Sequence, residues 1–131
     1  VDLFDGAPDV VAAASALDAS FARLPWPLDV AIFGMGTDGH TASFFPGGDR
    51  LDACLDPGSK RKVETLRAPA AGEPRITLTL PALLASCAIA LHIEGASKSA
   101  ALERARAGGP EADMPIRAVL ERADVDVFRC P

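Results

Sequence analysis

Aromatic residues and histidines are scarce in this chain of 131 residues, and positive charge is in deficit. Aromatics make up 5% and tyrosine is absent, so we expect no base-stacking surface for single-stranded nucleic acid. The 13 Lys and Arg residues face 18 Asp and Glu, which opposes non-specific binding to phosphate backbones or anionic membranes. No apolar run approaches the roughly 20 residues of a transmembrane helix. We therefore expect neither nucleic acid nor membrane as a partner.

Cysteine is also rare. Cys54, Cys87 and Cys130 are odd in number and far apart, without the paired spacing of a zinc site. We expect neither a metal nor a cofactor. The simplest interpretation is reduced thiols in a cytoplasmic protein. The acidic start at residues 1–5 does not resemble a signal peptide.

Helix and strand patterns alternate along the first half of the chain. Residues 9–24 are rich in alanine and carry apolar residues at helical spacing, which predicts a helix. A strand is predicted at 28–33. The polar stretch at 47–62 indicates a surface loop, and 63–66 a short edge strand.

The second half repeats this alternation. Pro81 suits the first turn of a helix, and a second alanine-rich helix is predicted at 96–106. The nearly continuous apolar run at 87–93 is typical of a strand covered on both faces in a parallel sheet. A short helix at 115–122 and a strand at 125–128 complete the pattern. We therefore expect one α/β domain over residues 1–131, with a doubly wound, mainly parallel sheet and helices on both faces.

A glycine-rich loop directly follows the first predicted strand. The spacing of Gly34, Gly36 and Gly39 matches a dinucleotide-binding fingerprint. That fingerprint also requires a long helix after its third glycine, whereas Pro46 and the two glycines after it end any helix within two turns. A strand that leads into glycines, a carboxylate and an imidazole instead predicts an active-site loop at the carboxyl edge of an α/β sheet.

His40 and Asp38 are the candidate catalytic residues of this loop. A neutral imidazole near pH 7 is the usual general base, and the alternative is a loop histidine without a role. Asp38 could orient the imidazole ring, accept a hydrogen bond from a substrate hydroxyl, or form an Asx-type turn before Gly39. The N–H groups from Gly36 to Gly39 are candidate donors to a ligand oxyanion.

Two cations could hold an anionic ligand. Lys98 falls in the first turn of the helix predicted at 96–106, so it is either part of a phosphate cradle or a solvated lysine. Arg75, between Pro74 and a β-prone segment, is a ligand cation or equally a surface residue. His92 lies among apolar neighbours in a predicted strand, and we expect it to be buried or at an interface.

Four blocks of this sequence resemble the 6-phosphogluconolactonase family of the oxidative pentose phosphate pathway. They follow the family's order and extend over nearly the whole chain, which makes the resemblance more specific than any single motif. The blocks are residues 28–47, 74–83, 93–98 and 114–120. The resemblance implies that His40 is the catalytic base, that Lys98 is a phosphate ligand and that Arg75 lies near the substrate.

Related glucosamine-6-phosphate deaminases and isomerases share the glycine and histidine core, but their motif continues with a glutamate that serves ring opening. Phe45 stands before Pro46 here, without a carboxylate, which favours the lactonase. Family members are about twice as long, and their amino-terminal half carries a phosphate loop. We therefore expect a truncated domain whose amino-terminal strands are missing.

The resemblance implies hydrolysis of 6-phospho-D-glucono-1,5-lactone, with His40 activating water and without a metal. A second hypothesis is that this chain alone is a sugar-phosphate-binding or structural half that needs an amino-terminal partner. The unpaired edge of a half sheet favours self-association. The expected ligand is thus a small sugar-phosphate lactone, and the expected partner is the missing half or a second copy.

Overall fold

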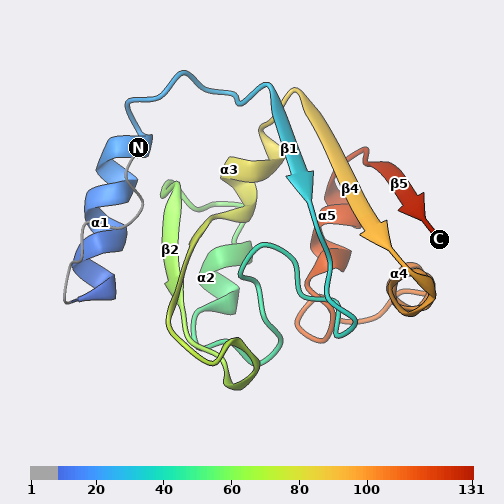
Figure 1. Cartoon of the computed structure of the whole chain (residues 1–131). Helices are drawn as coiled ribbons and strands as arrows, with labels where there is room; N and C mark the ends of the chain where they lie inside the picture. The colour runs from blue at the N-terminus through green and yellow to red at the C-terminus, as the bar shows by residue number, and fades with distance from the viewer. Residues whose placement is uncertain (1–8) are drawn as a thin grey trace.

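The computed structural model describes residues 9–131, and the acidic start at residues 1–5 lies outside this range. Its centre is a three-stranded parallel sheet in the order β1-β4-β5 (Figure 1). The strands are β1 (Val30–Phe33), β4 (Ala88–Glu94) and β5 (Asp126–Cys130). Because they run in parallel, all three end at the same edge of the sheet. The predicted α/β class with a mainly parallel sheet is confirmed.

A second, smaller sheet stands apart from the first. It pairs β2 (Val63–Leu66) with β3 (Arg75–Leu78) in antiparallel register, which confirms the predicted edge strand. Helix α1 (Val10–Phe21) packs against this small sheet (Figure 1). Asp9 caps α1 by accepting a hydrogen bond from the Val11 N–H at 2.9 Å, as short polar side chains do at helix starts.

The remaining helices lie between the strands in the sequence, and the last two both lie between β4 and β5. Pro81 lies in the first turn of its helix, as predicted, because the missing N–H of proline costs no hydrogen bond there. No helix among the described residues has the length and apolar character needed to cross a membrane. The helices are α2 (Leu51–Leu55), α3 (Leu80–Leu84), α4 (Ala96–Arg106) and α5 (Ile116–Arg122), with a 3-10 turn η1 (Pro69–Ala71).

Helix α2 corrects the prediction of a surface loop over residues 47–62. Leu51, Cys54 and Leu55 are buried, and their i, i+3, i+4 spacing places them on one helix face. A helix this short is stabilised by packing rather than by propensity, which is why the polar composition concealed it. Burial raises the pKa of the Cys54 thiol to about 12, so the group stays protonated and acts as a small core residue.

Only one face of the parallel sheet is covered within the described residues. Phe33, Leu91 and Ile93 point into a core shared with α2 to α5, whereas the alternate residues of β1 and β4 are largely exposed. The expectation that the strand at 87–93 is covered on both faces is therefore wrong for this chain. We call the second surface the uncovered face and define it by Val30, Ile32, Ala88, His92 and Phe128.

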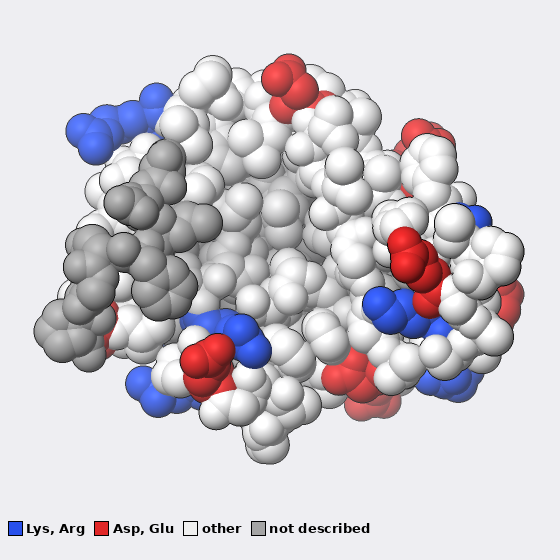
Figure 2. All heavy atoms as spheres, in the orientation of Figure 1, with Lys and Arg blue, Asp and Glu red and all other residues white. Residues whose placement is uncertain are grey.

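Side chains of the uncovered face, most of them apolar, lie opposite one another on neighbouring strands. Val30 pairs with Ala88, and His92 pairs with Phe128. Ile32 is 74% exposed, and the His92 side chain is 50% exposed, so His92 is not buried in this chain. In the view of Figure 2, the hollowed middle shows no charged side chain, and charged side chains lie around it. Contiguous apolar surface of this kind marks a site of contact with another segment or molecule.

Arg117 joins the end of α4 to the segment before α5. Its guanidinium donates to the carbonyls of Ala105 at 3.3 Å, Pro110 at 3.0 Å and Arg104 at 3.2 Å. The residue is only 8% exposed, so its charge is sheltered from water. These bonds join two carbonyl groups in the last turn of α4 to the Pro110 carbonyl beyond it, and they fix the path of the chain between α4 and α5.

We expect Arg117→Met to lower the free energy of unfolding by about 3 kcal/mol, because it removes three hydrogen bonds from a charged donor that is only 8% exposed. Arg129→Met is the matched control, since Arg129 pairs with Glu103 on the surface and such pairs contribute about 1 kcal/mol or less. Urea unfolding of both variants measures the difference. Equal losses in the two variants would contradict the role assigned to Arg117.

Candidate active site

The loop that follows β1 is closed by hydrogen bonds between its own backbone groups. The Gly36 N–H donates to the His40 carbonyl at 2.9 Å, and the Gly39 N–H donates to the Gly36 carbonyl at 3.0 Å. The Thr41 hydroxyl donates to the Gly34 carbonyl at 2.7 Å. The result is a tight turn at the carboxyl edge of the parallel sheet, which is where open α/β sheets bind ligands.

His40 and Asp38 form a hydrogen-bonded pair in this turn. His40 Nδ1 lies 2.7 Å from Asp38 Oδ1, and the same oxygen accepts the His40 backbone N–H at 3.1 Å. Because an ionised carboxylate only accepts, the pair places the imidazole proton on Nδ1 and leaves a lone pair on Nε2. Nε2 has no hydrogen-bond partner within residues 9–131, and the side chain is 32% exposed. The ring can therefore accept a proton at Nε2.

The ionised form of Asp38 is favoured by this arrangement. Partial burial raises the pKa of Asp38, but the hydrogen bonds from the His40 backbone and ring, together with the charge of the ring, outweigh burial and hold it below the ordinary value of 3.8. Asp38 thus both orients the imidazole ring and forms an Asx-type turn, which were two of the alternatives that the sequence left open.

Gly36 makes room for the pair. A Cβ at this position would lie 2.3 Å from His40 Nδ1 and 2.5 Å from Asp38 Oδ1, both far shorter than any real contact. The N–H groups of Gly36 and Gly39 are used inside the loop, so in this conformation they are not free donors for a ligand oxyanion. The absence of a side chain at Gly36 instead leaves space for the imidazole ring.

Residues far along the chain hold the loop in place. The Ile116 N–H donates to the Gly39 carbonyl at 2.9 Å, and Arg104 donates to the Thr37 carbonyl at 2.8 Å. Gly39 has φ +83°, and a Cβ there would lie 2.7 Å from Met114 Cβ. Both ends of the segment 104–116 therefore contact the turn that carries His40, through hydrogen bonds and through the packing of Met114 against Gly39.

Phe45 connects His40 with Arg75. Its ring stacks on the imidazole with centroids 4.3 Å apart and planes 22° apart, and the Arg75 guanidinium carbon lies 6.0 Å from the Phe45 ring centroid. Arg75 also donates to the Ala71 carbonyl at 2.9 Å and lies 3.5 Å from Glu73. The structure thus brings Arg75 toward His40 through an aromatic ring, without a direct contact between the two.

Lys98 occupies the first turn of α4, directly beyond the end of β4. Because β1 and β4 end at the same edge, and Arg104 of the same helix bonds to the loop, Lys98 belongs to the edge that carries His40. No hydrogen bond joins Lys98 to His40, so the phosphate-binding role of Lys98 stays a prediction.

Three residues of this neighbourhood escaped the sequence analysis as site residues, namely Phe45, Arg104 and Met114. Phe45 had a weak signal, because an aromatic residue five positions after a candidate base is close enough to stack on it. Arg104 and Met114 carried none, since the sequence does not indicate how α4 and the segment before α5 approach the loop.

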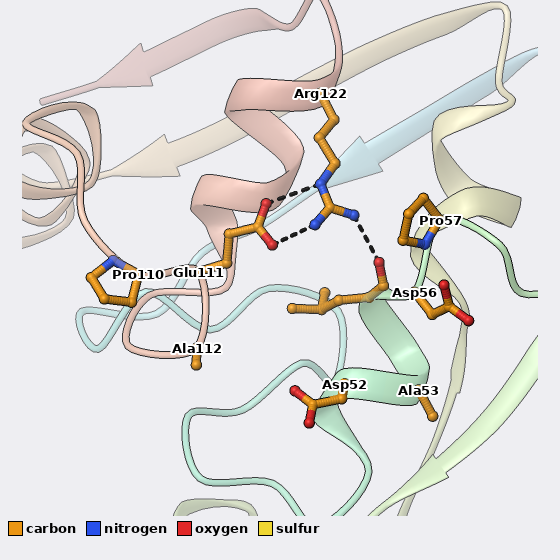
Figure 3. A pocket seen from close by; sticks show the side chains of 9 residues that line it. Asp52, Ala53, Asp56, Pro57, Pro110, Glu111, Ala112 and Arg122 are labelled. Atoms are coloured by element: carbon orange, nitrogen blue, oxygen red, sulfur yellow. Dashed lines mark hydrogen bonds and ion pairs between the residues drawn. The ribbon is translucent and has the colours of Figure 1, made fainter.

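A cavity of about 690 Å³ lies away from this loop, between the end of α2 and α5 (Figure 3). Inside it Arg122 forms a two-pronged pair with Glu111 and donates to the Leu55 carbonyl at 2.7 Å. Arg122 is thus engaged as a structural tie, and no predicted site residue lines the cavity. Within residues 9–131 no group of three or more His, Cys, Asp or Glu is placed to hold a metal ion.

Gly36→Ala is expected to separate His40 from Asp38, because its Cβ needs the space of both side chains. The pKa of Asp38 then rises toward 3.8, and a rate that depends on His40 falls about a hundredfold, as displacements near 1 Å can cause. Gly34→Ala is the matched control, since nothing lies within 4 Å of a Cβ there. NMR titration of the Asp38 carboxyl carbon compares them, and an unshifted Asp38 in Gly36→Ala would contradict the steric argument.

The depressed pKa of Asp38 makes a pH-dependent contribution to stability. The ionised carboxylate favours the folded state at pH values above 3.8, and this contribution is lost as the pH falls through the lower folded pKa. The melting temperature of the natural chain should therefore exceed that of Asp38→Asn by a constant amount near neutral pH, with the gap closing in acid. A gap that does not change between about pH 7 and pH 2 would show that ionisation is not involved.

Comparison with known proteins places this chain in a family. Residues 3–128 match the family described as glucosamine-6-phosphate isomerases/6-phosphogluconolactonase. The chain is 52% identical over 123 residues to a 6-phosphogluconolactonase of Rhizobium meliloti, covering 94% of this chain and 53% of that protein. It is 50% identical to a 6-phosphogluconolactonase of Mesorhizobium japonicum, covering 100% of this chain and 55% of that protein.

Solved structures agree with the sequence match. A 6-phosphogluconolactonase from Shewanella baltica superposes with a TM-score of 0.87 at 36% identity, covering 92% of this chain and 52% of that one. A glucosamine-6-phosphate deaminase of the NagB superfamily superposes with a TM-score of 0.71 at 23% identity, which shows the shared fold. The chain spans about half the length of the curated relatives it matches. It belongs to the glucosamine-6-phosphate isomerase/6-phosphogluconolactonase family.

Proposed function

We propose that this chain supplies the catalytic base of a lactonase that hydrolyses 6-phospho-D-glucono-1,5-lactone to 6-phosphogluconate. The observation that carries the proposal is the His40–Asp38 pair, whose 2.7 Å hydrogen bond leaves Nε2 of the imidazole to accept a proton. The names of the relatives at 40–52% identity support the choice of reaction.

His40 acts on water in this mechanism. Nε2 takes a proton as the water oxygen bonds to the lactone carbonyl carbon, and the carbonyl electron pair moves onto its oxygen. The tetrahedral intermediate then collapses, the bond to the ring oxygen breaks, and Nε2 returns its proton to that oxygen as it leaves. Asp38 stabilises the imidazolium that forms between these steps. General-base assistance of this kind is typically worth about 10²–10⁴-fold in rate, without a covalent intermediate.

Two cations are proposed to meet the substrate. Lys98, in the first turn of α4, would hold the phosphate together with free N–H groups of the helix. Arg75, close to Phe45 and hence to His40, would lie beside the sugar. With a net charge of −5 on the chain, an anionic substrate needs such local cations, because the overall field of the protein repels it.

A second candidate function is that of a non-catalytic half that binds sugar phosphate or completes a larger fold. The uncovered face favours it, since an apolar sheet surface with Ile32 and Phe128 exposed needs a cover. We propose that an amino-terminal half, of the kind that accounts for the additional length of the relatives, covers this face. Self-association of the chain alone is the expected consequence when that half is missing.

Two further points bear on the proposal. A deaminase function is less favoured, because Phe45 stands where the resemblance places a glutamate in the deaminases. The free thiols Cys54, Cys87 and Cys130 support a reducing, cytoplasmic compartment.

The central test measures lactone hydrolysis by the chain alone and after mixing with the additional half of the Rhizobium meliloti relative. We expect the mixture to exceed the spontaneous rate, and His40→Asn to lose about 10²–10⁴-fold of that enhancement. A His40→Asn variant that folds and keeps the natural rate would remove the mechanism. Catalysis by the chain alone would instead refute the need for a second half, and sedimentation of the same samples reports which species is present.

Lys98→Ala tests the phosphate site separately. We expect a rise in KM for the phosphorylated lactone of about tenfold, with little change for glucono-1,5-lactone, because a charged hydrogen bond is worth about 1.5–3 kcal/mol. Lys60→Ala, in the loop before β2, is the matched control. An unchanged preference for the phosphorylated lactone would show that Lys98 is not a ligand.

A further inference from the structure

The Asp38 hydrogen bond alone does not fix the His40 ring. A single bond at Nδ1 restrains that nitrogen, but combined rotations about χ1 and χ2 can still tilt the plane of the imidazole. Nε2 lies on the far side of the ring, so a tilt carries it through an arc. A base that must meet a water molecule within hydrogen-bond distance needs a second constraint.

Phe45 supplies a surface that meets this need. Its ring lies nearly parallel to the imidazole, with centroids 4.3 Å and planes 22° apart, so the two rings are stacked. A contact with the flat face opposes the tilt that the hydrogen bond permits. The constraint at Nδ1 and the constraint on the ring plane are therefore complementary.

Phe45 is held more firmly than the ring it supports. It is 8% exposed, and its neighbour Phe44 is fully buried. The Phe45 carbonyl accepts the Gly48 N–H at 3.1 Å, and the Phe44 N–H donates to the Thr41 carbonyl at 2.8 Å. Phe45 is thus anchored in the core by its own segment, whereas a third of the His40 side chain faces solvent.

Gly36 limits the ring on another side. The position of its absent Cβ lies 2.3 Å from Nδ1 and 2.4 Å from Cε1 of His40, so the edge of the imidazole rests against the Gly36 backbone. The ring is consequently enclosed by a hydrogen bond to Asp38, a stack on Phe45 and a backbone contact at Gly36.

We propose that Phe45 is a positioning residue, which fixes the plane of the His40 imidazole so that Nε2 faces the substrate. Its importance for catalysis rests on the proposed function, in which His40 is the base. Its effect on the orientation of the ring does not depend on that function.

The test compares Phe45→Leu, which removes the aromatic face, with Phe45→Tyr, which keeps it. Phe44→Leu is the matched control for loss of an aromatic residue from the core. The first readout is ¹³C relaxation of the His40 ring in the 131-residue chain, compared between the natural chain and the three variants. We expect the His40 ring to be ordered in the natural chain, in Phe45→Tyr and in Phe44→Leu, and to become mobile in Phe45→Leu.

The second readout is kinetic, on whichever form of the chain hydrolyses the lactone, alone or with the added half. We expect Phe45→Leu to lower kcat about fivefold with KM unchanged, and Phe45→Tyr to stay within about twofold, since an aromatic pair of this geometry contributes modestly. If Phe45→Leu fails to fold, Phe45→Met provides the same comparison with a flexible side chain.

Two results would overturn the proposal. The first is a His40 ring that remains ordered in Phe45→Leu, which would mean that Asp38 and Gly36 suffice. The second is a mobile ring with an unchanged kcat, which would leave His40 as the base and remove the role of Phe45. Failure of the proposed function looks different, because His40→Asn would then keep the natural rate whatever the ring relaxation shows.

Discussion

Closure of the turn between Gly36 and His40 is the constraint on which the rest of the site depends. The hydrogen bond from the Gly36 N–H to the His40 carbonyl brings the two residues so close that a Cβ on Gly36 would overlap the imidazole. The same closure places Asp38 within 2.7 Å of Nδ1. The hydrogen bond between Gly36 and His40 thus determines the position of the base. The Asp38 carboxylate beside Nδ1 determines the tautomer and leaves Nε2 as the accepting nitrogen.

The turn does not hold this shape unaided. Bonds from Arg104 and Ile116 reach its carbonyl groups across more than half of the chain's length, and Arg117 fixes the segment from which they come. Catalytic geometry and fold stability are therefore linked in this chain. A substitution near α5 can disturb His40 without touching it, because the Ile116 N–H bonds to the Gly39 carbonyl of the loop.

Local patterns predicted much of the fold and part of the site. Alanine-rich helices, the edge strand at 63–66 and the start of α3 at Pro81 followed from spacing and proline chemistry, and the pairing of Asp38 with His40 followed from their separation by two residues. Helix α2 escaped because its stability comes from burial of Leu51 and Leu55. The contacts that Arg104 and Met114 make with the loop depend on how distant elements approach, and spacing along the chain does not encode that.

The uncovered face explains why the expectation that β4 is buried on both faces was wrong. Residues 87–93 form a nearly continuous apolar run, as in a strand buried on two sides, but within the described residues only the side of Leu91 and Ile93 is covered. The sequence thus fits the environment of a longer protein, consistent with relatives about twice the length of this chain. The core on the covered side is nevertheless continuous, and it supports the loop that carries His40.

The position of the proton on the His40 ring tests the central claim most directly. Long-range ¹H–¹⁵N correlation spectra of the neutral imidazole distinguish the nitrogen that bears the proton from the nitrogen that does not. The account predicts a proton on Nδ1, held by Asp38, and a bare Nε2 that is able to accept one. A proton found on Nε2, or shared equally between the two nitrogens, would contradict it, because the imidazole would then present no dedicated base to the substrate.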